Sequence, residues 1–137
     1  MIGGSGVALP ARRLLIGGAL LMALATAIGA LAAHALKTSL APDRFSVLQT
    51  AVLYQFIHAL GLLIVGGLTA RHASRGLRIA GDLLLAGVLL FSGSLYLLLC
   101  GAPQFIGVLT PIGGVCLIAG WCAAAAVFWR ATYPAAS

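Results

Sequence analysis

The sequence predicts an all-α integral membrane protein, a four-helix bundle with both termini in the cytoplasm. Two observations give the class: of 137 residues, 62% are hydrophobic and only 7% are charged, whereas a soluble domain carries about a quarter charged residues. A third gives the architecture, because the apolar residues form four runs, each near the roughly 20 residues that a helix needs to cross a bilayer.

The whole chain, 1–137, is expected to be one transmembrane domain with spans at about 14–36, 45–70, 79–99 and 105–129. Arg12 and Arg13 precede the first run, which is similar to a twin-arginine secretory signal with a cleavage site at Ala33-His34-Ala35. The apolar part of a signal is only about 7–15 residues long. The length of this run therefore favours a membrane span.

Charged residues and proline predict where the second and third spans begin. Pro42 and Asp43 are expected to act as a stop and a helix N-cap at the start of the second span. Asp82 follows Arg78 by four residues, and we expect it in the first turn of the third span. There it suits the helix dipole and pairs with that arginine.

The fourth span has two candidate starts. Thr110 and Pro111 fit an N-cap followed by proline at the first helical position. If the helix begins near Phe105 instead, Pro111 has to kink it. Trp129 and Tyr133 are expected to anchor the end of this span at the membrane interface.

The basic residues predict the orientation in the membrane. They divide six to two between the two sides, with Lys37 and Arg44 on one side and, on the other, Arg12, Arg13, Arg71, Arg75, Arg78 and Arg130. The positive-inside rule places the richer side, and with it both termini, in the cytoplasm. Because the basic residues flank apolar runs, we expect them to contact lipid headgroups. No nucleic-acid partner is expected, since there is no basic stripe with interleaved aromatic residues.

Polar residues within the spans form the candidate site. With the predicted spans and orientation, they lie in the outer half of the membrane on all four helices. They are His34, Tyr54, Gln55, His58, Ser92, Ser94, Tyr96 and Thr110. Under one interpretation these groups hydrogen-bond one another and specify helix packing. Under the other they line a small polar cavity that binds a ligand or cofactor.

Spacing predicts how some of these groups meet. Tyr54 and His58 are four residues apart and share a helical face, as do Ser92 and Tyr96, while Ser94 points elsewhere. We expect His58 to find its partners on other spans, with Ser92 and Tyr96 first among them. Gly93, between the two serines, is expected to permit close approach of another helix.

No metal site, cofactor or catalytic residue is predicted. His34 and His58 differ in depth by roughly 15 Å at ~1.5 Å per residue, too far to ligate one iron. The three cysteines, Cys100, Cys116 and Cys122, lack the CxxC or His/Cys spacing of a zinc site. Paired carboxylates, a nucleophile elbow and a phosphate-binding glycine loop are all missing from the sequence.

Four blocks, one on each span, carry a family resemblance. They are Gly29-Ala-Leu-Ala-Ala-His34-Ala-Leu-Lys37, Tyr54-Gln55-Phe-Ile-His58-Ala-Leu60, Phe91-Ser-Gly-Ser-Leu-Tyr96, and Thr110-Pro-Ile-Gly-Gly114 running on to Gly120-Trp121. The chain resembles the YgdD-like and YwdK-like proteins, small four-span inner-membrane proteins of unknown function with animal mitochondrial relatives. Leu31 and Ala32 depart from the family pattern, which has an aromatic residue and a glycine there. The resemblance implies a multi-pass protein of the bacterial inner (plasma) membrane and no particular activity.

Together these observations favour a non-enzymatic interaction or accessory component of the membrane. It would associate with copies of itself or with a larger membrane complex, surrounded by lipid. This interpretation rests on the small residues in the spans and on the small number of residues outside the membrane. The alternative is a protein that binds or transports a small ligand through the outer polar cavity.

Overall fold

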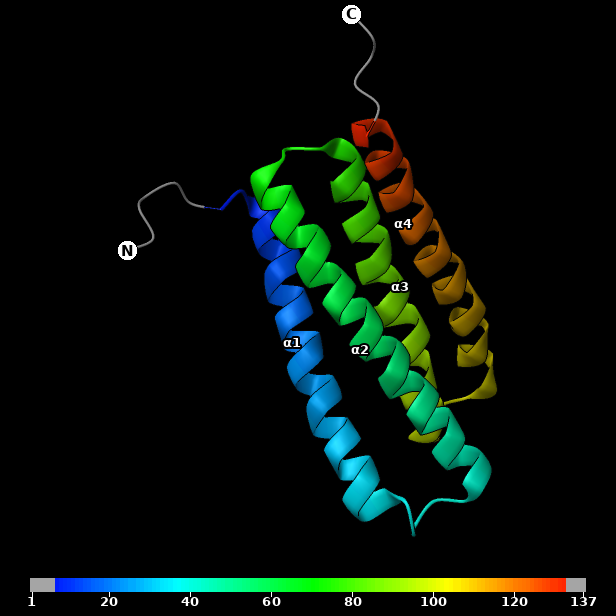
Figure 1. Cartoon of the computed structure of the whole chain (residues 1–137). Coiled ribbons are helices and arrows are strands. Elements are labelled where there is room, and N and C mark those ends of the chain that lie inside the picture. Colours follow the sequence, from blue (N-terminus) through cyan, green and yellow to red (C-terminus); the bar gives the residue numbers. More distant parts are fainter. Residues whose placement is uncertain (1–6, 133–137) are drawn as a thin grey trace, which may run out of the picture.

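The computed structural model describes residues 7–132 and shows long helices packed side by side (Figure 1). Each has the length and apolar composition to cross a membrane, which confirms the predicted all-α, four-helix membrane fold. The helices are α1 (Leu9–Leu31), α2 (Pro42–Arg71), α3 (Arg75–Leu99) and α4 (Leu109–Thr132). A π-helical segment, Ala32–Leu36, extends α1, and a 3-10 segment, Gln104–Val108, precedes α4.

Local sequence explains how α2 and α3 begin. Ala41 occupies the N-cap of α2 and Pro42 its first helical position, where the missing N–H is not needed. Asp43 therefore lies inside the first turn, and its predicted role as N-cap is wrong. Ser74 caps α3, with its hydroxyl oxygen 3.4 Å from the backbone nitrogen of Leu77.

Pro111 lies in the first turn of α4, because the α-helix begins at Leu109 and a 3-10 segment precedes it. A proline there displaces no helical hydrogen bond and need not kink the helix. The prediction that Thr110 is the N-cap is wrong, since Thr110 is already helical. Trp129 lies near the end of α4 and is exposed, whereas Tyr133, the other predicted anchor, falls outside the described residues.

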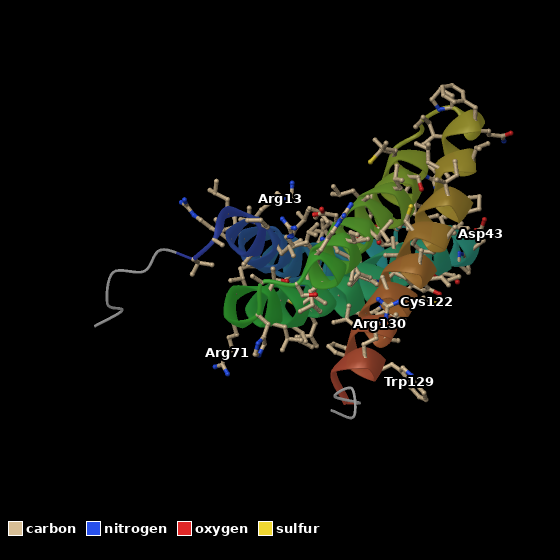
Figure 2. All side chains as sticks on the ribbon, turned by 90° about the horizontal axis from the view of Figure 1, so that it is seen from above. Arg13, Asp43, Arg71, Cys122, Trp129 and Arg130 are labelled. Atoms are coloured by element: carbon tan, nitrogen blue, oxygen red, sulfur yellow. The ribbon has the colours of Figure 1, made fainter. Side chains whose placement is uncertain are left out.

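The helices alternate in direction, so α1 and α3 begin at the end of the bundle where α2 and α4 finish (Figure 1). We call this end, which carries Arg13, Arg71 and Arg75, the basic end. Figure 2 shows Arg13 and Arg71 toward it and Asp43 at the opposite end. The positive-inside rule predicts that the basic end faces the cytoplasm.

The charge pair at the basic end differs from the one predicted. Because α3 begins at Arg75, Asp82 lies seven residues further on and outside the first turn. Its carboxylate accepts a hydrogen bond from the Arg13 guanidinium of α1, and the pair forms a salt bridge. The expected pairing with Arg78 is wrong, since the neighbouring helix presents an arginine at the same depth.

Close packing of α3 on α4 depends on glycines that the sequence analysis did not single out. A methyl group on Gly113 of α4 would lie 2.9 Å from the Gly87 carbonyl oxygen of α3. Gly93 has no neighbouring atom within 4 Å of such a methyl position, so its predicted role in close approach is wrong. The main buried core contains Leu14, Leu62, Val65, Leu77, Ala80, Leu84, Val88, Leu117 and Ala124, which come from all four helices.

Candidate functional site

Gln55 is the centre of the polar cluster. Its side chain is only 1% exposed, and both ends of its carboxamide are hydrogen-bonded. Nε2 donates to the backbone carbonyl of Leu21 in α1 at 2.8 Å, and Oε1 accepts from the Tyr96 hydroxyl of α3 at 2.6 Å. One side chain of α2 thus joins three helices, and its polar atoms are satisfied at a depth where water is absent.

The two serines of α3 bond in opposite directions, as the spacing predicts. Ser92 donates to the Ala51 carbonyl of α2 at 2.8 Å. Ser94 shares a hydrogen bond of 2.7 Å with the Thr110 hydroxyl of α4 and also donates to the Phe91 carbonyl at 2.9 Å. The cluster therefore extends through all four helices.

His58 is buried, but its partners are not those predicted. Its Nδ1 lies 2.7 Å from the Tyr54 carbonyl oxygen, one turn earlier in the same helix. A carbonyl only accepts, so Nδ1 carries the proton. The expectation of bonds to Ser92 and Tyr96 is wrong, because Ser92 bonds to the α2 backbone and Tyr96 to Gln55.

Aromatic rings surround His58 in place of polar partners. The Tyr54 ring stacks on it with centroids 5.7 Å apart and stacks on Phe91 of α3 at 4.4 Å. The Trp121 ring of α4 lies 6.2 Å away at a tilt of 50°. Trp121 also covers Gly61, where a methyl group would lie 2.9 Å from the indole. The imidazole is thus held within an aromatic contact that joins α2 to both later helices.

His34 does not join the cluster. It lies in the π-helical extension of α1 and is exposed. Within residues 7–132, no group of three or more His, Cys, Asp or Glu side chains is placed to hold a metal ion. The cysteines in this range are free thiols, two of them exposed.

Two hollows lie near these residues. The one beside the cluster has a volume of about 80 Å³ and is lined by Leu21, Leu24, Gln55, Val88, Leu89, Ser92, Gly93 and Tyr96. A larger, open groove of about 380 Å³ runs between α1 and α2 toward the opposite end, lined by Gly29, Ala32, Ala33, Phe45, Gln49, Val52, Leu53 and Phe56. Tyr54 and His58 line neither of them.

Gln49 is the residue that the sequence analysis missed. It is exposed on α2 within the larger groove. A carboxamide inside a predicted apolar span was the available signal, but Gln49 stands near the start of the run, where polar residues are common. Gln49 and Gln55 are six residues apart and point to different faces, and only packing shows which of them is buried.

Comparison with known proteins identifies the family. The model of a family described as "Protein of unknown function (DUF423)" matches residues 28–114. A UPF0382 membrane protein of Staphylococcus haemolyticus is 43% identical over 104 residues, which cover 76% of this chain and 84% of the relative. The UPF0382 membrane protein YwdK of Bacillus subtilis is 42% identical over 106 residues, with coverage of 76% and 85%.

A more divergent relative, a UPF0382 membrane protein of Haemophilus influenzae, is 40% identical over 95 residues, with coverage of 69% and 76%. No solved structure matches. The expected likeness to YwdK-like proteins is confirmed, as is the multi-pass membrane location. The chain belongs to the DUF423 family of membrane proteins of unknown function.

Proposed function

We propose that this protein is a non-enzymatic membrane component that acts by association, and that a second copy of the chain occupies the groove between α1 and α2. The observation that carries the proposal is Gln49. Its carboxamide lies in an otherwise apolar groove and has no hydrogen-bond partner among residues 7–132. Gln55, on the same helix, has both of its polar atoms bonded.

Gln49 lies near the start of α2, close to where the hydrocarbon of the membrane begins. It follows Pro42 by seven residues, which is about 10 Å along the helix axis. A polar group without a partner in hydrocarbon costs several kcal/mol. The nearby Thr50 hydroxyl avoids this cost by donating to the Ser46 carbonyl at 3.0 Å. Gln49 makes no such bond to its own helix, so its carboxamide is free to bond a group from outside the chain.

The floor of the groove suits another helix. Gly29 and Ala33 carry almost no side chain and are at least partly exposed, and small residues let helix backbones approach closely in a membrane. Ala32, between them in the groove wall, is buried against α2. A methyl group on Gly29 would already touch Val52, at 3.4 Å. A larger side chain at Gly29 would therefore reduce the groove.

A second copy is favoured over an unrelated partner because a carboxamide complements itself. It offers donors on nitrogen and an acceptor on oxygen, so two Gln49 side chains can bond each other across a two-fold axis. Such an axis brings the same surface of each copy together. The Gln49 side chain of each copy then provides the hydrogen-bond partner of the other, and the groove needs no second polar group.

The polar cluster also supports a role in association over a role in ligand binding. Its side chains, apart from His34, are engaged with one another, with backbone carbonyls or with aromatic rings. The hollow beside it, about 80 Å³, is well below the roughly 300–1,000 Å³ of ligand pockets. These features favour a structural network over the cavity of a ligand-binding or transport protein.

Gln49→Leu is expected to weaken the dimer. Hydrogen bonds between membrane helices contribute about 1–2 kcal/mol in model peptides, so the dimerisation constant should fall roughly 5- to 30-fold. The measurement is the dimer fraction in liposomes over a series of protein-to-lipid ratios. Thr50→Val is the matched control, because it removes a neighbouring polar group that is already bonded within α2, and it should leave the curve unchanged. A wild-type protein that stays monomeric at every ratio would exclude the proposal.

A further inference from the structure

Another hollow, lined mainly by charged side chains, opens at the basic end between the starts of α1 and α3. It has a volume of about 260 Å³ and is lined by Pro10, Arg13, Arg75, Arg78, Ile79 and Asp82. We propose that this arginine cleft binds the phosphate of an anionic phospholipid. The inference is independent of the groove between α1 and α2.

The charges in the cleft are unbalanced. Three guanidinium groups face one carboxylate, and the salt bridge between Arg13 and Asp82 uses that carboxylate. Arg75 and Arg78 are exposed and have no acidic partner within residues 7–132. The other acidic residue of the chain, Asp43, lies at the opposite end of the bundle (Figure 2). The two remaining positive charges are therefore free to bind an anion from outside the chain.

Helix stability does not explain why arginines stand here. Both α1 and α3 begin at this end (Figure 1), and neither has an acidic residue in its first turn. The N-terminus of a helix carries a partial positive charge, so a cation there is unfavourable for the helix. Arg75 begins α3 and adds to that potential. A bound phosphate, whose oxygens accept paired hydrogen bonds from guanidinium groups, would offset this unfavourable positive potential.

The position of the cleft selects a lipid as the source of the phosphate. It lies at the end of apolar spans, where the phosphate layer of a bilayer meets the protein. Its wall also contains Ile79, which is 46% exposed and can contact the upper part of an acyl chain. Basic pockets between transmembrane helices are a recurrent type of lipid-headgroup site. Free inorganic phosphate shares the charge chemistry but gains nothing from Ile79.

The test measures binding of phosphatidylglycerol to the detergent-solubilised full chain by native mass spectrometry, with phosphatidylcholine and inorganic phosphate as comparison probes. In the double variant Arg75→Gln/Arg78→Gln, affinity for phosphatidylglycerol should fall roughly 100-fold, since a hydrogen bond between charged groups at a defined site contributes about a tenfold factor for each arginine. Arg71→Gln/Arg130→Gln removes the same charge from the same end but outside the cleft, and it should change affinity less than threefold.

Several results would overturn the proposal. Equal losses in the two double variants would mean a diffuse surface attraction and no site. Equal binding of phosphatidylglycerol and phosphatidylcholine would remove the role of charge. Displacement of the lipid by millimolar inorganic phosphate would make the ligand a soluble anion. All four arginines are exposed and lie near helix ends, so each variant should keep its unfolding temperature, and that measurement checks that it is folded. A variant that fails the check is replaced by its Arg→Lys counterpart, for which a twofold to fivefold loss of affinity is expected.

Discussion

Replacing Gly113 with alanine is expected to destabilise the bundle by more than about 2 kcal/mol, the upper part of the range for overpacked sites. The new methyl group would meet the Phe91 backbone nitrogen and lie 2.9 Å from both the Phe91 Cα and the Gly87 carbonyl oxygen. These are backbone atoms of α3, so no side-chain rotation can relieve the contact. The two helices must move apart, and the Ser94–Thr110 bond beside them should break. The measurement is heat unfolding in detergent.

Gly114→Ala provides the control for Gly113→Ala. It is the same change one position further along α4, where the added methyl group would meet the Phe91 ring at an ordinary 3.8 Å. Alanine also favours a helix over glycine by about 1 kcal/mol. Gly114→Ala should therefore leave the unfolding temperature unchanged or raise it. Equal stabilities for the two variants would contradict the backbone contact between α3 and α4.

Gln55→Leu is expected to lower stability by roughly 2–3 kcal/mol. The leucine fills a similar space but leaves the Tyr96 hydroxyl without its acceptor and the Leu21 carbonyl without its extra donor. A buried polar group without a partner costs about 1–3 kcal/mol. Heat unfolding of the monomer in detergent measures the effect. Adding Tyr96→Phe removes one stranded group and should recover part of the loss.

Gln49→Leu is the matched control for Gln55→Leu, since it is the same substitution on the same helix. Gln49 is exposed in the groove and bonds to nothing within residues 7–132, so the monomer should keep its stability. If Gln49→Leu destabilises the monomer as much as Gln55→Leu, the distinction between a buried network and an outward-facing glutamine is wrong.

The general architecture could be predicted because it depends on composition. Apolar runs of membrane-spanning length and grouped arginines predict helices and their ends within a few residues. The opposite directions of Ser92 and Ser94 also follow from helical geometry alone. Helix starts were less predictable, because Pro42 and Thr110 fit more than one N-terminal register.

Partner choice could not be predicted, because it depends on how adjacent helices are rotated and shifted. Asp82 has an arginine four residues away in its own helix, yet it pairs with Arg13 of α1. His58 has hydroxyl groups near its depth on α3, yet it donates to its own helix. Sequence spacing shows which residues are neighbours within one helix. The contacts of Asp82 and His58 also depend on how far apart two adjacent helices lie.

Cysteine cross-linking in native membranes tests whether two copies of the chain associate through the groove between α1 and α2. The three native cysteines are first replaced by serine, and one new cysteine is placed at Leu53, in the groove, or at Ile118, on α4. Both positions are strongly exposed, at 55% and 66%. We expect an oxidised dimer with Leu53→Cys and none with Ile118→Cys, and adding Gln49→Leu should reduce the Leu53→Cys product. Equal cross-linking at the two positions, or none at Leu53→Cys, would contradict association through this groove.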